Sequence, residues 1–270
     1  MFRPLCLVAV CMACLPGTPA SAQDSIPALP SPVPEIPRID LPEDEIETLL
    51  QRSADDYEQK RRAKAGGALL EVAEIIESLA APNAARLSAE VEAFRNLAVE
   101  AARGRLDPQV VDFTAARACI QLASLFHAQQ QGRWKAGNPK ESGRDWYRAL
   151  LFLQRSIEWG GFGMQESGEQ TLHSGKELAG GLVNGHPVDA DEVRSAVQRT
   201  GRMINEVGRA IFSKAGDEWQ PEPTEAPEAV QPDPRQASRF VQPASEKAAK
   251  KSAKRHWKLR DLFKPAAAGQ

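Results

Sequence analysis

Residues 145–159 read DWYRALLFLQRSIEW, a segment with apolar and aromatic residues on nearly every side of a helix. It lies at the heart of Trp134–Phe162, where the bulky aromatic residues of the chain are concentrated: Trp134, Trp146, Tyr147, Phe152, Trp159 and Phe162. A helix that is apolar nearly all the way round is usually a buried one. The pattern therefore predicts a central helix that the other helices surround.

The flanking segments carry apolar residues at steps of three and four, which is the spacing of one helical face. Such faces run through residues 43–64, 69–79, 87–101, 107–132, 164–184 and 189–216. No segment shows the sustained two-residue alternation of a half-buried strand. We therefore expect an all-α fold, a bundle of about five to seven mostly antiparallel helices flanked by disordered, proline-rich segments.

Three helix starts carry capping signals. Asp107 precedes Pro108, so its side chain can accept from the first-turn amides while proline occupies the first helical position. Ser142 with Asp145 three residues on is similar to a capping box and predicts the start of the central helix. Asp189 predicts the start of the last helix.

Glycines are expected to interrupt or tighten the helices. Gly66-Gly67 weakens the pattern between the first two segments. Gly168 and Gly175 lie on the apolar face of residues 164–184, where each costs about 1 kcal/mol relative to alanine. Close packing of another backbone against that face would offset this cost.

The N-terminus has the features of an export signal. Arg3 supplies a positive charge, an apolar stretch runs from Leu5 to Leu15, and the Ala-x-Ala pattern ends at Ala22. We expect cleavage before Gln23. The apolar stretch is about half of the 20 residues that a spanning helix needs, so the mature chain is expected to have no transmembrane helix.

The cysteines agree with this interpretation. Cys6, Cys11 and Cys14 lie in the signal, so Cys119 is the only thiol of the mature chain and no intramolecular disulfide can form. Cys119 lies between apolar positions, which predicts a small buried residue. Lipidation at Cys14 is an alternative to simple cleavage.

Composition divides the chain into five parts. Residues 1–22 are the signal peptide, 23–42 a proline-rich disordered leader, 43–216 the helical domain, 217–235 an acidic proline-rich linker, and 236–270 a basic tail that can form a short amphipathic helix. The formal net charge of −2 conceals this division, because the acidic linker and the basic tail offset each other.

The basic tail is the most specific functional signal. Its cations lie beside aromatic residues: Lys247, Lys250, Lys251, Lys254, Arg255, Trp257, Lys258, Arg260, Phe263 and Lys264. Such a segment can bind an anionic surface by charge while its apolar residues insert. For an exported protein the expected partners are anionic lipid, cell-wall polymer or an envelope protein, and nucleic acid is not expected. The plainer alternative is a solubilising disordered tail.

Motifs for metal or cofactor binding are not found. None of the histidines forms a His-x-x-x-His pair, and no Cys-x-x-Cys-His occurs. Cys11 and Cys14 have the Cys-x-x-Cys spacing but lie in the presumed signal, so no cofactor and no metal site are expected in the mature chain. His127 follows the apolar face of its helix and is expected at the surface or at an interface.

One short string suggests an enzyme. Gln165-Glu166-Ser167-Gly168, followed by Ala179-Gly180-Gly181-Leu182, distantly resembles the Glu-Ser motif and later Gly-Leu-Met-Gln element of lytic transglycosylases. The resemblance covers about twenty residues and implies that Glu166 is the general acid and base of a peptidoglycan-cleaving enzyme. Val183-Asn184 stands where the family has Met-Gln. The plainer alternative is an exposed glutamate at a helix start.

The residues favour a binding protein over an enzyme. We expect an exported, non-enzymatic helical scaffold of the periplasm or cell envelope, with peptidoglycan cleavage through Glu166 as the alternative. The aromatic-rich region has exposed edges in this hypothesis, and Trp134, Trp159 and Phe162 form its candidate partner rim. Neither the partner nor the oligomeric state is specified by these features.

Overall fold

The computed structural model describes residues 42–81, 84–221 and 240–243. The predicted signal peptide, the leader before residue 42, most of the acidic linker and the cations of the tail fall outside the described residues. Within the described ranges, no helix combines the length and the apolarity needed to cross a bilayer.

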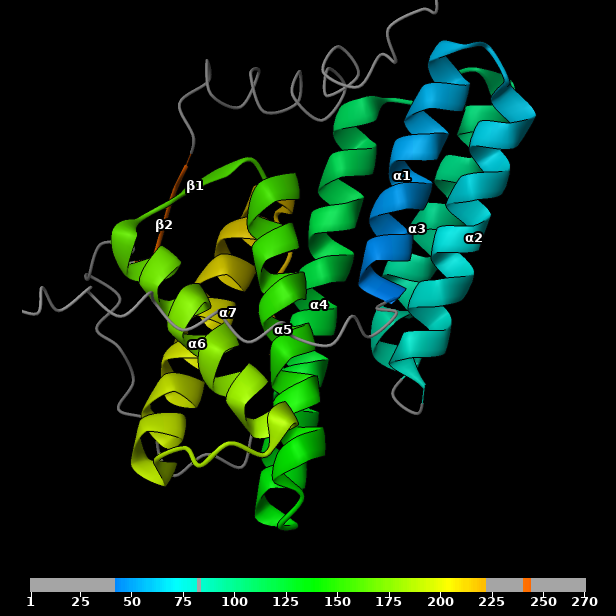
Figure 1. The fold of residues 1–270 in the computed structure, drawn as a ribbon. Coiled ribbons are helices and arrows are strands. Elements are labelled where there is room, and N and C mark those ends of the chain that lie inside the picture. Colours follow the sequence, from blue (N-terminus) through cyan, green and yellow to red (C-terminus); the bar gives the residue numbers. More distant parts are fainter. Residues whose placement is uncertain (1–41, 82–83, 222–239, 244–270) are drawn as a thin grey trace, which may run out of the picture. The chain divides into compact units, whose positions relative to one another are not determined.

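These ranges form an all-α helical bundle with one short strand pair (Figure 1). The elements are α1 (Pro42–Glu58), α2 (Arg62–Ala80), α3 (Ala84–Arg103), α4 (Pro108–Lys135), α5 (Pro139–Trp159), β1 (Phe162–Met164), α6 (Glu166–Asn184), α7 (Ala190–Ala215) and β2 (Val241–Pro243).

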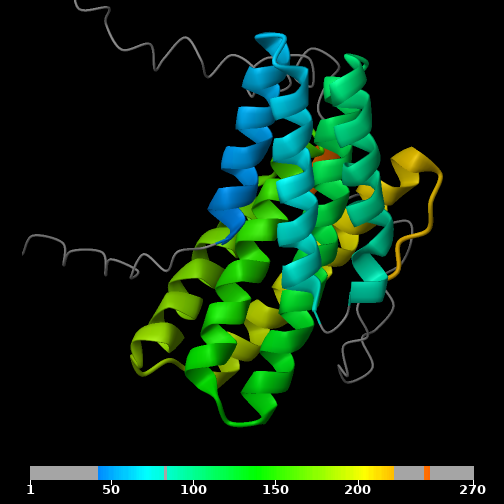
Figure 2. The same ribbon diagram turned by 90° about the vertical axis from the view of Figure 1, so that its right-hand side faces the viewer.

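Helices α4 and α5 form a long antiparallel hairpin at the centre of these contacts (Figures 1 and 2). On one side α3 packs against α4, and α2 and α1 follow it. On the other side α6 packs against α5, and α7 contacts α4, α5 and α6. The hairpin therefore joins an N-terminal group, α1–α3, to a C-terminal group, α6 and α7.

The α4–α5 seam contains the largest buried side chains. Trp146 of α5 is fully buried, and its Nε1 donates to Thr200 Oγ1 of α7 at 3.2 Å. Phe152 of α5 stacks on Phe126 of α4, with ring centroids 5.7 Å apart and planes 5° from parallel. The central position expected for residues 145–159 is confirmed, although α4 shares it and buries residues such as Ile120 on several faces.

The break between the first two helices differs from the predicted one. It falls at Lys60, which has a positive φ of 61°, whereas Gly66-Gly67 lies inside α2. Gly66 serves close packing rather than helix termination, because a Cβ there would lie 2.7 Å from the Ala98 carbonyl oxygen of α3. Two helices can approach this closely only where one lacks a side chain.

The central helix begins at Pro139, before the predicted start at Ser142. Ser142 is fully buried and ties the hairpin together, because its Oγ donates to the Gln130 carbonyl at 3.1 Å and accepts from Gln130 Nε2 at 3.2 Å. The other two predicted starts are confirmed. Asp107 accepts from Gln109 N, and Asp189 accepts from Asp191 N and Glu192 N.

The adjacent glycines of α2 provide a matched test of this packing. Gly66→Ala is expected to lower the free energy of unfolding by about 1–3 kcal/mol, because its methyl group meets the α3 backbone. Gly67→Ala is expected to raise it by up to about 1 kcal/mol, since no atom lies within 4 Å of the new methyl group. Urea denaturation measures both, and equal effects would contradict the close α2–α3 approach.

Candidate interaction site around α7

The predicted rim is divided between two ends of the central hairpin. Trp134 lies in the last turn of α4, whereas Trp159 ends α5 and Phe162 begins β1. Helix α5 is about 30 Å long at 1.5 Å per residue, so Trp134 is separated by that length from the other two. All three side chains are partly buried against the core. Only Trp159 and Phe162 remain candidates for one common site.

Lys214 of α7 contacts the end of the hairpin at which Trp159 and Phe162 lie. From the last turn of α7, Lys214 Nζ donates to the Gly160 carbonyl at 3.1 Å and lies 3.9 Å from the centroid of the Phe162 ring. Burial lowers the pKa of Lys214. The cation therefore contacts both the C-terminal carbonyl of α5 and an aromatic face, which holds β1 against α7.

The edge of β1 is occupied by the chain's own C-terminal segment (Figure 1). Strands β1 and β2 are antiparallel, with Phe162 opposite Pro243, Gly163 opposite Gln242, and Met164 opposite Val241. This pairing brings residues 240–243 to the place where the rim of Trp159 and Phe162 lies.

The backbone of Phe240 is held on both sides. Gln165 N donates to the Phe240 carbonyl at 3.0 Å, and Phe240 N donates to Glu206 Oε1 of α7 at 3.0 Å. The Phe240 side chain is partly buried and packs against the core. Both polar groups of this residue are therefore satisfied by the bundle.

Glycine 168 makes room for that backbone. A Cβ at Gly168 would lie 3.0 Å from the Phe240 carbonyl oxygen and 2.9 Å from Met164 Cγ. The close backbone approach expected at this glycine is confirmed. Gly175 differs, because a Cβ there would meet the side chain of Leu150 at 2.9 Å rather than a backbone.

A second attachment point follows α7 directly. Trp219 is only 9% exposed, and its indole lies where a Cβ at Gly208 would come within 2.4 Å of the ring. Its Nε1 donates to Asn205 Oδ1 at 3.2 Å, and its ring packs on Phe212 with centroids 5.1 Å apart. Residues 217–221, which composition assigns to the acidic linker, thus contact α7.

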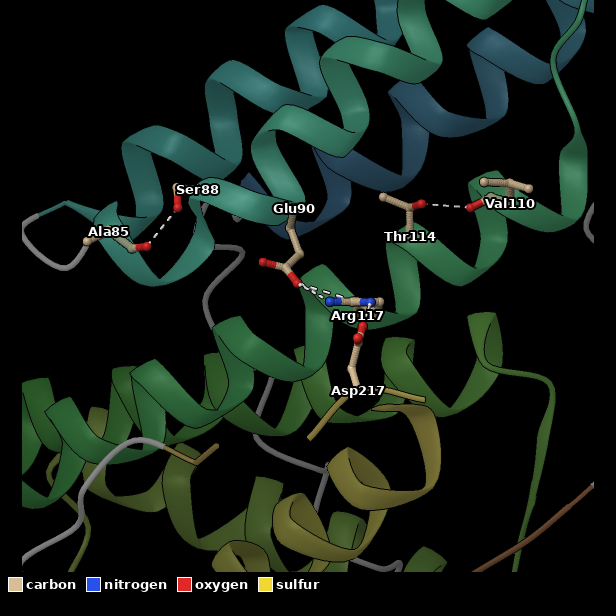
Figure 3. A network of polar contacts seen from close by, with 7 residues as sticks. All are labelled: Ala85, Ser88, Glu90, Val110, Thr114, Arg117 and Asp217. Atoms are coloured by element: carbon tan, nitrogen blue, oxygen red, sulfur yellow. Dashed lines mark hydrogen bonds and ion pairs between the residues drawn. The ribbon is translucent and has the colours of Figure 1, made fainter. Parts of the chain in front are cut away.

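An arginine clamp holds the same segment (Figure 3). Arg117 of α4 lies 3.3 Å from Glu90 Oε1 of α3 and also pairs with Asp217 Oδ2, just after α7. Its guanidinium lies over the Phe212 ring, 4.5 Å from the centroid. Glu90 is 3% exposed, and burial raises its pKa although the charge of Arg117 acts to lower it.

The segment also reaches α3. Arg86 donates to the Pro221 carbonyl at 2.6 Å, in agreement with the path of the chain beside α3 in Figure 2. The residues after α7 therefore contact α3, α4 and α7 together. None of these contacts could be read from the composition of the linker, although Trp219 is a bulky aromatic among acidic residues and prolines, which was an available signal.

Removing the arginine tests the clamp. Arg117→Met is expected to lower the free energy of unfolding by roughly 3 kcal/mol at about pH 8, because Glu90 is left buried without its cation. The cost should shrink at about pH 5, since a buried carboxyl with a raised pKa takes up a proton there. The double variant Arg117→Met, Glu90→Gln should recover most of the loss. Thermal denaturation of the wild type and the two variants measures this. A double variant no more stable than Arg117→Met would contradict the role of Arg117 as the cation that compensates the buried charge of Glu90.

His127 was expected at the surface or at an interface, and the surface position is wrong because the side chain is buried against α7. It is 5% exposed, and its Nε2 lies 3.1 Å from the Val197 carbonyl of α7. Burial lowers the pKa of His127. Gly201 admits the ring, because a Cβ there would lie 2.9 Å from His127 Cε1.

Among the described residues, no group of three His, Cys, Asp or Glu side chains could hold a metal ion. The buried position expected for Cys119 is confirmed.

Glu166 lies exposed in the first turn of α6. Ala179 and Leu182, which complete the resembling string, are buried in the same helix about 20 Å further along its axis. The arrangement agrees with the plainer alternative of an exposed glutamate at a helix start. Peptidoglycan cleavage through Glu166 stays a prediction.

Asp112 of α4 is the other unusual carboxyl. Its Oδ1 is buried without a hydrogen-bond partner among the described residues. Burial, with a smaller contribution from the charge of Asp107, raises the pKa of Asp112 to about 7. Between the unfolded pKa of about 3.9 and this value, only the folded chain binds the proton, so stability falls as the pH rises through that window.

Asp112→Asn is therefore expected to raise the free energy of unfolding by roughly 1–2 kcal/mol at about pH 8, because a partly buried charge without a partner is removed. The gain should largely disappear near pH 4, because Asp112 is then protonated in the folded chain and about half protonated in the unfolded chain. Thermal denaturation at the two pH values measures this. An equal gain at both would show that ionisation of Asp112 is not the cause.

Comparison of the chain with protein-family models, with curated proteins and with solved structures finds no match. A functional proposal for this chain therefore has to be argued from its own residues and contacts.

Proposed function

We propose that the chain is an exported protein of the periplasm or cell envelope that acts by binding. In this proposal the helices form a scaffold, and the basic tail docks to an anionic surface or an envelope partner. The observation that carries it is the attachment of residues 240–243 to β1 and Glu206, directly before the basic segment that begins at Lys247.

This attachment gives the tail a defined origin. Lys247 follows Pro243 by four residues, and an extended chain covers at most about 3.5 Å per residue, so Lys247 lies within about 14 Å of the end of β2. A tail that binds a surface from this origin also brings the scaffold to that surface. A tail joined only through a long linker would leave the scaffold at a variable distance.

The composition of the tail supports an anionic surface. Near such a surface each Lys or Arg contributes about 1 kcal/mol, and the contribution falls off within a Debye length. Trp257 and Phe263 add apolar surface that can insert beside the charges. The signal pattern of residues 1–22 supports a location where anionic lipid and cell-wall polymer are both present.

Neutralising the tail tests this function. A chain with Lys250, Lys251 and Lys254 changed to Gln should bind vesicles containing phosphatidylglycerol about 100-fold more weakly, since three surface charges contribute about 3 kcal/mol. A matched control changes Lys64, Lys140 and Arg194, three exposed cations of the helices, to Gln. Cosedimentation should show near-wild-type binding for the control and weaker binding for both wild type and control at high salt.

The same proteins distinguish the possible surfaces. Binding to purified sacculi but not to vesicles would assign the tail to cell-wall polymer, and the reverse would assign it to lipid. Equal retention of the tail variant and the control on both materials and on envelope extracts would overturn the proposal.

A further inference from the structure

The contacts of residues 240–243 have the form of a bound peptide. They come from a segment distant in sequence, and they combine a backbone ladder with one aromatic side chain packed against the core. In recognition by strand addition, main-chain hydrogen bonds supply affinity and side-chain contacts supply specificity. We propose that β1, Gly168 and Glu206 form a peptide-binding site, and that residues 240–243 are its ligand, bound in cis and exchangeable.

The site fixes the backbone at Phe240, a bend residue that directly precedes β2. Glu206 Oε1 accepts from the N–H of this residue, and Gln165 N donates to its carbonyl. Gly168 keeps the approach open, because any larger residue would place a Cβ 3.0 Å from that carbonyl oxygen. The next three residues, Val241–Pro243, pair with β1 as a strand, so the ligand is a bend at Phe240 followed by an extended segment.

The site also selects side-chain chemistry. Phe240 packs against the core, and the notch at Gly168 is flanked by Met164 and Met203, whose flexible thioethers adapt to an apolar ligand. At the other end of the ladder Pro243 lies opposite Phe162 and has no N–H to continue the pairing. The recognised chemistry is an aromatic residue at a bend, followed by an extended segment with proline three positions after the aromatic residue.

Exchange follows from the size of the contact. A two-stranded ladder of three residues a side is marginal by itself. Occupancy in cis therefore depends on the covalent connection, which for a short linker is equivalent to a local concentration on the order of millimolar. A free peptide of the same chemistry therefore competes poorly with residues 240–243 for the site in the wild-type chain. It competes well in a variant whose residues 240–243 bind more weakly.

Full-length protein carrying Phe240→Ala tests the site. The probe is a labelled peptide of residues 236–246, which contains none of the cations from Lys247 onward. Fluorescence anisotropy should show that the Phe240→Ala chain binds it at least about ten-fold more tightly than wild type does, because the competing segment is weakened. The same peptide with Phe240→Ala should bind the variant chain at least about ten-fold more weakly.

A notch variant and its control locate the binding. Adding Gly168→Ala to the Phe240→Ala chain should abolish peptide binding, whereas adding Gly132→Ala, where no atom lies within 4 Å of the new methyl group, should leave it unchanged. Circular dichroism of each protein verifies that the helices are retained.

Three results would overturn the peptide-binding site. They are no binding of the wild-type peptide by the Phe240→Ala chain, equal binding of the two peptides, or equal binding with and without Gly168→Ala. A concentration-dependent dimer of the wild type that Phe240→Ala abolishes would overturn occupancy in cis, because a second copy would then supply the ligand. Vesicle binding is measured separately and depends on other residues, so this proposal and the proposed function can fail independently.

Discussion

The buried seam between α4 and α5 fixes how the helices on both sides of it pack. Trp146 needs a partner for its indole N–H once it is buried, and Thr200 supplies one only if α7 packs across the hairpin. The stacked rings of Phe126 and Phe152 set the register between α4 and α5. The seam therefore determines where α7 lies, and α7 in turn carries Asn205 and Glu206, which receive the two C-terminal attachments.

Glycines in the helices act as receiving positions. Gly66 receives the backbone of α3, Gly201 the ring of His127, Gly208 the indole of Trp219, and Gly168 the backbone of Phe240. At each, the missing side chain costs helix stability and permits a close contact from elsewhere in the chain. Three of these four glycines lie in α6 and α7, the helices to which the C-terminal segments attach.

Local patterns predicted the helices well because the spacing of apolar residues and the caps at Asp107 and Asp189 are local properties. Local patterns gave the wrong position for residues whose role depends on a neighbouring helix. Gly66 can end a helix or admit a neighbour, and only the position of α3 decides between them. His127 is polar by type, and its burial depends on Gly201 in a helix distant in sequence. The strands are too short to show any periodicity.

The sequence predicted one side of the candidate site, the rim residue Phe162, but not the segment that contacts it. Aromatic density pointed to Phe162, but its occupant lies in a part of the sequence that composition assigns to a disordered tail. Nothing in the local pattern relates Phe240 to Glu206, because that relation arises only when α7 is in place. Trp134 was grouped with Phe162 by closeness in sequence, and the length of α5 separates them.

The two attachments along α7 also define how a mechanical load would enter the protein. Force applied to the tail reaches the ladder of β1 and β2 first, and only after this ladder has opened does it reach Trp219 and the clamp of Arg117. The ladder and the buried contacts of Trp219 and Arg117 would therefore be loaded in series, with the smaller contact first.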